Sequence, residues 1–161
     1  MRLVQGSQRV DIAGGQPDVA KDVRVPRAQL GQLLAQIERQ LARQMEQALA
    51  GDGLTVDQYR VLDLLSDGEG HTMSEIVTAI VIPGPTLTKI VDRLVDAGAV
   101  YRLVDVRDRR RVLAFLSEAG RTLHNRLRPQ IEAAESSMLD VLGADGPVLL
   151  ALLTRLADRP S

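Results

Sequence analysis

The stretch VYRLVDVRDRRRVLAFL, residues 100–116, decides the fold that this sequence predicts. Its ends, Val100–Val104 and Val112–Leu116, are rich in residues that favour strands, whereas six of the seven residues between them are charged. This pattern is typical of a β-hairpin with a charged tip. The segment between Gly98 and Val112 has a balance of +3, from two aspartates and five arginines: Arg102, Arg107, Arg109, Arg110 and Arg111. The rest of the chain then holds 15 basic and 19 acidic residues, so positive charge is concentrated in the hairpin.

Two short helices are expected directly in front of this hairpin. Thr72 and Glu75 form a capping-box pattern, which predicts a helix ending near Ile80. A tight connection then leads into a second helix, from about residue 84 to 97, with Gly98 as its C-cap. This second helix has two different sides. Its apolar side carries Leu87, Ile90, Val91 and Leu94, and its polar side carries Pro85, Thr88, Lys89, Asp92 and Arg93.

A short helix, a tight turn, a helix with one polar side and a charged hairpin together predict a winged helix-turn-helix. The apolar side of the second helix would pack on the core and leave the polar side free to enter a major groove of DNA. The arginines of the hairpin suit phosphate or minor-groove contacts next to it. Taken alone, a charged loop or a polar helix side is usually plain solvated surface. Their order along the chain is what favours nucleic-acid binding.

The helices on either side of this lobe are longer. Residues 26–50 form one amphipathic pattern, and a helix of that length exceeds what a small core needs, so a partner subunit is expected to cover part of it. The next helix begins with the capping-box pattern of Thr55 and Gln58. Ser117 starts another long pattern, in which Pro129 should cause a kink or a break. Pro147 is expected to open the last helix.

The predicted fold class is therefore mainly α with a small β-hairpin wing. Residues 1–25 contain several glycines and scattered charge without a period, so they are expected to form an extension. The remainder, 26–161, is predicted to be one domain. It would consist of the winged helix-turn-helix at 54–116 and helices for dimerisation at 26–50 and 117–158.

The composition excludes several classes of function. The chain has 161 residues, a formal net charge of -1, 2% aromatic residues and no cysteine. Without cysteine, disulfide scaffolds, thiol catalysis and cysteine redox sensing are excluded, and the scarcity of aromatic residues argues against stacking on single-stranded bases. No catalytic motif is recognisable, so neither an enzyme nor a cofactor is expected. The absence of a signal peptide and of a long apolar run favours a cytoplasmic protein.

Four stretches of this sequence resemble the MarR family of transcriptional regulators. They are LTVDQYRVLDLL (54–65), TMSEI (72–76), PTLTKIVDRLVDAGAV (85–100) and DVRDRRRVLAFLSEAG (105–120). The last is the most specific, because it resembles the family's wing signature at Asp108, Arg110, Leu116, Ser117, Glu118 and Gly120. With the flanking helices included, the resemblance covers nearly everything except residues 1–25.

The resemblance implies a homodimer that binds a pseudo-palindromic site on double-stranded DNA and is expected to act as a repressor. The implied recognition-helix contacts are Pro85, Thr86, Thr88, Lys89 and Arg93, and the implied wing contacts are Arg107, Asp108, Arg109 and Arg110. Lys89 is expected to contact a base edge or a phosphate. Asp108 is expected to orient Arg110, since a carboxylate is repelled by phosphates. Arg93 has a structural alternative, which is to pair with Asp92 or Asp96.

One departure from the family concerns the turn between the two short helices. The family commonly has a glycine, an apolar residue and then a serine or threonine cap at this turn, whereas this chain has VIPGP at 81–85. Valine is a poor residue for a left-handed turn, and Pro83 has no side chain that can cap a helix. The turn is therefore expected to be reshaped. This turn and the acidic overall balance favour an alternative function, a winged-helix module that binds protein and not DNA.

The resemblance also implies control by a small lipophilic or phenolic ligand. Gln36, Gln40, Tyr59 and Arg60 are the candidates to line its pocket, although Tyr59 has the alternative of being an ordinary core residue. No metal site is predicted, because Arg128 stands where a second histidine would follow His124. His71, in a glycine-rich stretch, is interpreted as an exposed loop residue.

Overall fold

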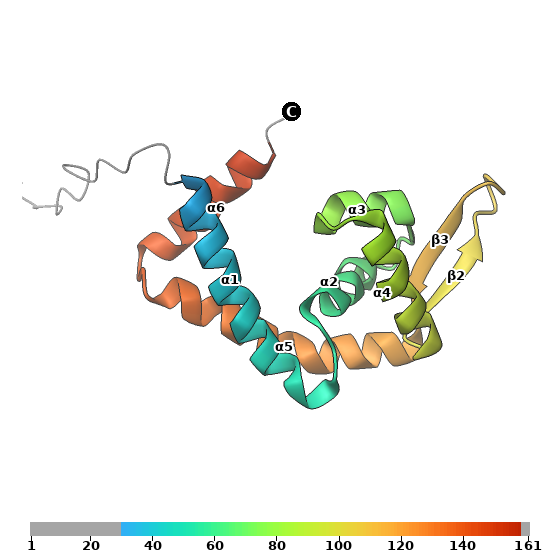
Figure 1. The fold of residues 1–161 in the computed structure, drawn as a ribbon, viewed down its shortest axis with the longest axis horizontal. Coiled ribbons are helices and arrows are strands. Elements are labelled where there is room, and N and C mark those ends of the chain that lie inside the picture. Colours follow the sequence, from blue (N-terminus) through green and yellow to red (C-terminus); the bar gives the residue numbers. More distant parts are fainter. Residues whose placement is uncertain (1–29, 159–161) are drawn as a thin grey trace, which may run out of the picture.

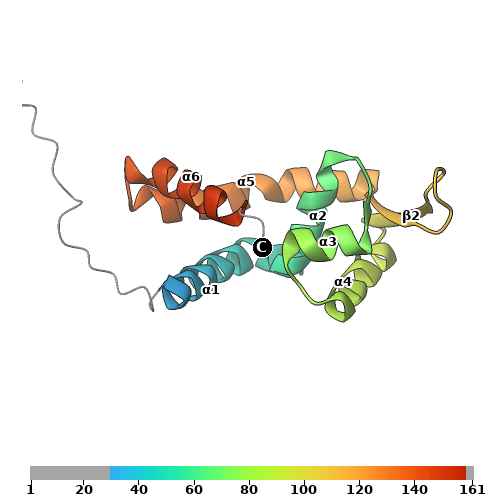
Figure 2. The same ribbon diagram turned by 90° about the horizontal axis from the view of Figure 1, so that it is seen from above.

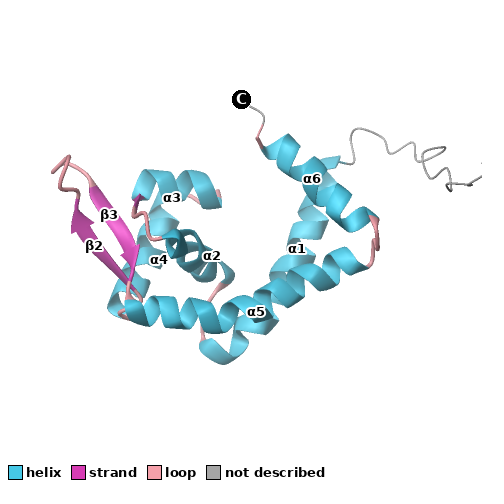
Figure 3. Ribbon diagram, turned by 180° about the vertical axis from the view of Figure 1, so that it is seen from behind, coloured by secondary structure: helices cyan, strands magenta, loops and turns pink. Residues whose placement is uncertain are grey.

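A computed structural model describes residues 30–158. The extension expected at 1–25 and the start of the helix expected from residue 26 lie outside the described residues. Figure 1 shows a lobe of short helices and a hairpin at one end, two helical arms at the other, and one long helix running between them. The fold is mainly helical with a small antiparallel sheet, as the sequence predicted (Figure 3).

The elements follow one another in the predicted order. The helices are α1 (Leu30–Leu49), α2 (Val56–Leu64), α3 (Met73–Ile80), α4 (Gly84–Asp96), α5 (Glu118–Asp140) and α6 (Asp145–Ala157), and the strands are β1 (His71–Thr72), β2 (Val100–Val104) and β3 (Val112–Leu116). Short 3-10 turns at Ala50–Asp52 and Leu65–Asp67 follow α1 and α2. Both strands of the hairpin have the predicted bounds.

Side-chain caps mark the starts of three helices. Thr55 with Gln58 and Thr72 with Glu75 form complete capping boxes at α2 and α3, and the Ser117 side chain accepts from the Gly120 N–H at α5. At the end of α4 the C-cap is Ala97 and not Gly98. Gly98 comes next with φ +71, the left-handed conformation that a glycine adopts without steric strain.

The sheet has a third strand that the sequence did not predict. Its order is β1-β3-β2, with both pairs antiparallel. β1 is only two residues long and pairs His71 with Ala114 and Thr72 with Leu113. The interpretation of His71 as an exposed loop residue is therefore wrong: it is partly buried, and its Nε2 lies 2.7 Å from Oδ2 of Asp67.

The lobe buries a continuous apolar core between α2, α3, α4 and the sheet. The predicted apolar side of α4 is buried in it, together with Val61, Leu62, Leu65 and Ile76. The start of α5 packs tightly against this lobe, because a side chain on Gly120 would meet the carbonyl group of Ala99. Gly120 therefore allows α5 to leave the lobe at the base of the wing.

A second, smaller core joins α1, α2 and α5. It contains Met45, Leu49, Val56, Tyr59, Leu127 and Ile131. Helix α5 continues from Glu118 to Asp140 with Pro129 inside it, so of the expected kink or break, the break does not occur. The carbonyl group of Asn125, which loses its partner at Pro129, belongs to an exposed residue where water can bind it.

The outer parts of the two arms are not covered by the rest of the chain. All residues from 30 to 40 of α1 are exposed, and Figure 2 shows α1 and α6 as separate arms. Large apolar side chains are exposed on both: Leu30, Leu33, Leu34 and Ile37 on α1, and Val148, Leu150, Leu152 and Leu156 on α6. No single helix within residues 30–158 has the length and hydrophobicity to cross a membrane. The pairs α3–α4 and α5–α6 have that length and hydrophobicity when each pair is taken together, but both pairs are sharply bent.

Candidate nucleic-acid interface

Helix α4 presents its polar side to solvent. Its direction differs from that of α3 by 110°, within the range of helix-turn-helix pairs. The predicted recognition residues Pro85, Thr86, Thr88, Lys89 and Arg93 are all exposed. Because the opposite side is anchored in the core, the polar side has a fixed orientation on the lobe.

The turn that leads into α4 is made by a valine in the left-handed conformation, at the place where the family commonly has a glycine. Val81 has φ 54 and ψ 48, which is the left-handed conformation expected of a glycine. For a β-branched residue this conformation costs about 1–2 kcal/mol. Pro83 provides no side-chain cap, as predicted, but its carbonyl oxygen accepts from the N–H groups of Thr86 and Leu87 at 3.0 Å. At this turn the structure therefore shows strain at Val81 and a main-chain cap at Pro83.

The loop of the wing is held by its two aspartates. Oδ1 of Asp105 accepts from the Arg107 N–H at 2.8 Å, and Oδ1 of Asp108 accepts from the Arg110 N–H at 3.0 Å. The Asp105 N–H donates to the Arg111 carbonyl oxygen at 2.9 Å and closes the loop. Asp108 therefore orients Arg110 through its main chain, and the loop has a defined shape.

Two of the five wing arginines are used within the lobe. Arg102 contacts Asp92 of α4 at 2.7 Å, and Arg111 contacts Glu75 of α3 at 2.9 Å. The pKa of Glu75 lies below its usual value, mainly because the Thr72 N–H donates to its carboxylate, with a smaller contribution from Arg111. These two ion pairs join the wing to the helix-turn-helix.

The other three wing arginines are not neutralised by the described part of the chain. Arg107, Arg109 and Arg110 are exposed, and none of them forms an ion pair with any residue in the range 30–158. They are the three arginines named in advance as wing contacts. Arg93 pairs with neither Asp92 nor Asp96 among the same residues, and Asp92 is taken by Arg102. Arg93 is therefore also unpaired beside the wing.

A buried histidine joins α5 to α2. His124 is 2% exposed, its Nε2 lies 2.8 Å from Oδ1 of Asp63, and its ring stacks on Tyr59 with the ring centroids 5.7 Å apart. Burial, and then the charge of Asp63, raises the pKa of Tyr59 to about 12. The sequence reasoning missed this contact. The spacing of Gly120, His124, Leu127 and Ile131 on one side of α5 was the signal that could have placed His124 inside.

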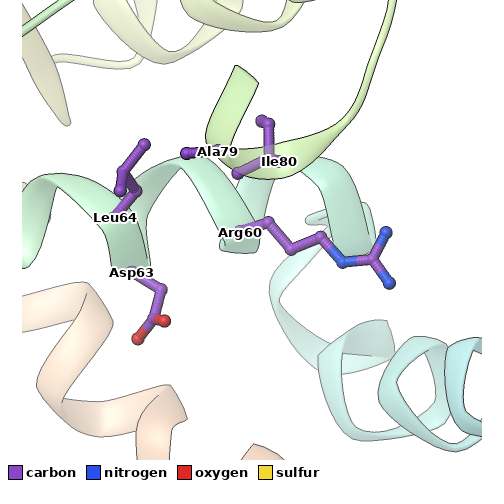
Figure 4. Close-up of a pocket in the computed structure, with 5 residues that line it drawn as sticks. All are labelled: Arg60, Asp63, Leu64, Ala79 and Ile80. Carbon is purple, nitrogen blue, oxygen red and sulfur yellow. The ribbon is translucent and has the colours of Figure 1, made fainter. Parts of the chain in front are cut away.

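Two cavities lie on either side of Asp63. One, of about 320 Å³ between α2 and α3, is lined by Arg60, Asp63, Leu64, Ala79 and Ile80 (Figure 4). The other, of about 380 Å³ between α2 and α5, is lined by Tyr59, Asp63, Ser66, His124, Arg128, Ile131, Glu132 and Glu135. No group of three His, Asp or Glu side chains in the described part of the chain is placed to hold a metal ion.

The four predicted pocket residues are not brought together. Tyr59 lines the cavity between α2 and α5, and Arg60 lines the one between α2 and α3. Gln36 and Gln40 line neither of these two cavities, because both lie on the uncovered half of α1. Within one chain, these four residues therefore do not line a common cavity.

The chain is similar to named transcription regulators over most of its length. The sequence profile of the MarR family matches residues 52–111. The HTH-type transcriptional repressor Rv2887 of Mycobacterium tuberculosis is 31% identical over 117 residues, which make up 73% of this chain and 84% of that protein. The chain belongs to the MarR family.

Solved structures of other MarR-type regulators share this fold. NadR in complex with 4-hydroxyphenylacetate has a TM-score of 0.74 at 28% identity and covers 86% of this chain and 99% of its own. CouR bound to a 23-mer DNA duplex has a TM-score of 0.71 at 28% identity, with coverage of 80% and 92%. The Rv2887 structure in complex with p-aminosalicylic acid has a TM-score of 0.68 at 28% identity, with coverage of 80% and 98%. The similarity between this chain and these structures thus includes the wing and the helical arms.

Proposed function

We propose that this chain is a homodimeric, sequence-specific regulator of transcription that binds double-stranded DNA and acts as a repressor. The observation that carries the proposal is the pairing of two surfaces on one lobe. These are the exposed polar side of α4 and the three unpaired arginines of the wing, joined by the Arg102–Asp92 ion pair. In this proposal the protein acts in the cytoplasm, where it has access to DNA, and has no catalytic activity.

The two surfaces have different roles in the proposal. Helix α4 enters a major groove with Pro85, Thr86, Thr88 and Lys89 near its start, where Lys89 contacts a base edge or a phosphate and Arg93 a phosphate. The wing reaches the adjacent minor groove with Arg107, Arg109 and Arg110, while Asp108 holds the loop. Concentrating the charge in three arginines of an otherwise acidic chain favours site-specific binding over general attraction to polyanions.

A second copy of the chain is the proposed partner of the uncovered arms. Exposed apolar side chains on α1 and α6 are costly in water and are covered when two copies interlock their arms. Dimer symmetry then places two copies of α4 against half-sites about one helical turn apart, which requires a pseudo-palindromic operator. Similarity to the DNA-bound CouR structure supports this arrangement.

A small lipophilic or phenolic molecule is the proposed effector. The cavity between α2 and α5 lies where the lobe meets α5, so a ligand there contacts both the DNA-binding part and the helix that leads to the arms. Such a ligand shifts the population between states with different spacing of the two α4 helices. Similarity to the ligand-bound structures of NadR and Rv2887 supports this part of the proposal.

Fluorescence anisotropy on the DNA upstream of the chain's own gene tests the proposed function. We expect Arg109→Gln to weaken binding and to reduce the slope of log affinity against log salt by about two, one contact for each protomer. The matched control is Arg43→Gln, which removes an exposed arginine from α1 and should leave the slope unchanged. A dimer that ignores this DNA, or an unchanged slope for Arg109→Gln, would overturn the proposal.

A further inference from the structure

We propose that the cavity between α2 and α5 selects a small organic cation, an aromatic ring that carries a protonated amine, and rejects the carboxylate of the same shape. The inference rests on the proposed function, because it names the chemical class of the effector. The proposed ligand class differs from the ligands in the NadR and Rv2887 complexes, since both of those are aromatic carboxylic acids.

The charges that line this cavity are mostly negative. Asp63, Glu132 and Glu135 contribute carboxylates, against the guanidinium of Arg128. Arg128 is already occupied, because its Nε lies 2.6 Å from Oε1 of Glu132. Three carboxylates therefore line this cavity against one guanidinium. Glu135 is the carboxylate without an ion-pair partner among residues 30–158.

The pKa values of two lining groups are raised mainly by burial and, to a smaller extent, by these carboxylates. Burial, followed by the charges of Asp63 and Glu132, raises the pKa of Glu135 above its usual value. Tyr59 also resists ionisation, mainly through burial and then through Asp63, Glu135 and Glu132. A ligand carboxylate would add a fourth negative charge to this site, whereas an ammonium group would compensate the existing ones.

A second, independent observation points to a ligand in this cavity. His124 lines it and is almost fully buried, yet its Nδ1 has no hydrogen-bond partner in the described structure. An unpaired buried polar atom is costly, and because Nδ1 is closed to solvent here, a ligand hydroxyl would pair with it only after a small shift of the ring. The stacked rings of Tyr59 and His124 and the side chain of Ile131 add a flat apolar wall. An aromatic ring with a hydroxyl and an ammonium group matches these features.

The neighbouring cavity between α2 and α3 is less acidic, because its charged lining consists of one carboxylate, Asp63, and one guanidinium, Arg60. Arg60 lies at its edge, 3.5 Å from Glu38 and 3.4 Å from Asp57, and three apolar side chains form the remaining wall. Figure 4 shows the Asp63 side chain directed toward α5 and the Arg60 guanidinium extended away from it. An anionic ligand would therefore bind near Arg60, which makes Arg60 the residue that distinguishes the two cavities.

A cation in the α2–α5 cavity would also affect DNA binding. Helix α2 belongs to the lobe that carries α4 and the wing, and α5 leads to the dimerisation arms. The Asp63–His124 contact joins these two helices at the cavity itself. A ligand that binds both Glu135 and Asp63 favours one arrangement of lobe and arm, and so changes the spacing of the two α4 helices.

The test uses two probes that differ in charge and share a phenol ring, tyramine and 4-hydroxyphenylacetate. Calorimetric titration of the full chain at neutral pH should give an affinity for tyramine at least about tenfold higher. Glu135→Gln should reduce the tyramine affinity by about tenfold. The matched control Glu46→Gln, an exposed carboxylate on α1 outside the cavity, should leave it unchanged. Tyramine, but not 4-hydroxyphenylacetate, should alter the anisotropy of the bound upstream DNA.

Equal affinity for both probes, or tighter binding of 4-hydroxyphenylacetate, overturns the inference. If that anion binds and Arg60→Gln abolishes its binding, the effector site is the α2–α3 cavity. DNA binding that is intact while neither probe binds also overturns the inference, but it leaves the proposed regulator in place. If tyramine binds but the chain binds no DNA in any condition, the inference about the cavity is supported and the proposed function fails.

Discussion

The winged lobe and the helical arms differ in how far they bury their apolar residues. In the lobe, Leu62, Leu87 and Val91 are completely buried by residues of the same chain. On the arms, leucines of similar size stay about half exposed, for example Leu33 on α1 and Leu152 on α6. The lobe therefore obtains its stability from its own core, whereas the arms need a second copy. The cavity between α2 and α5 lies at the boundary between these two parts, where a ligand can act on both.

Charging the arms should have the largest effect. We expect the double change Leu152→Glu and Leu156→Glu to prevent dimerisation, because carboxylates cannot be buried in an apolar interface. Affinity for the upstream DNA should fall by about a hundredfold or more, since two linked half-site contacts become single ones. Light scattering after size-exclusion chromatography and anisotropy measure the two effects. Leu103→Glu is the control for the light-scattering measurement and should leave the dimer mass unchanged. Leu103 is 52% exposed, against 48% for Leu152, but it lies on the wing. A charged arm that stays dimeric would contradict the comparison.

A cavity in the lobe core should be costly in a different way. Leu62→Ala removes a completely buried side chain from the lobe and should lower the free energy of unfolding by about 2–5 kcal/mol. Urea denaturation at one fixed protein concentration measures the loss. The half-exposed Leu103 is the matched position, where the change to alanine should cost less than about 0.5 kcal/mol. Equal losses at the two positions would show that the lobe core is not the main source of its stability.

The contact between lobe and α5 should tolerate no extra atom at Gly120. The added methyl group of Gly120→Ala would meet the main-chain carbonyl of Ala99, which cannot rotate away as a side chain can. We expect a loss of about 1–3 kcal/mol in thermal unfolding. Gly31→Ala provides the control, because nothing lies near that position on α1 and alanine is the better helix former by up to about 1 kcal/mol. A neutral Gly120→Ala would mean that α5 is not held against the base of the wing.

Relief of strain at the turn before α4 should be smaller and favourable. Val81→Gly removes a left-handed β-branched residue, and part of that gain is offset by the greater freedom of glycine in the unfolded chain. We expect a net stabilisation of about 0.5–1 kcal/mol in urea denaturation. The inverse change Gly68→Val, at a position with φ 79, should destabilise by about 1–2 kcal/mol. If Val81→Gly is destabilising, the valine side chain makes a contact that outweighs its strain.

The features that the sequence predicted depend on residues close together in the chain, whereas the contacts that it missed join residues far apart in the chain. The strand bounds of the wing, both capping boxes and the buried side of α4 are set by residues a few positions apart, and these predictions are confirmed. The pairing of His71 with Ala114 and the contact of His124 with Asp63 join residues 43 and 61 positions apart. Local patterns carry no information about such pairs. The same holds for Tyr59 and Arg60, which are neighbours in sequence and line different cavities.

The smallest effect is expected at the ion pairs that join the wing to the helix-turn-helix. Arg102 and Asp92 are 34% and 50% exposed, so water screens their attraction. A double-mutant cycle with Arg102→Gln and Asp92→Asn should give a coupling of about 0.2–1 kcal/mol, and 1 M salt should reduce it. A coupling as large as the loss at Leu62→Ala would reverse the comparison within the lobe, because the wing would then be held by charge and not by the shared core. A small coupling leaves the apolar core as what fixes the wing beside α4, with the ion pairs adjusting its angle.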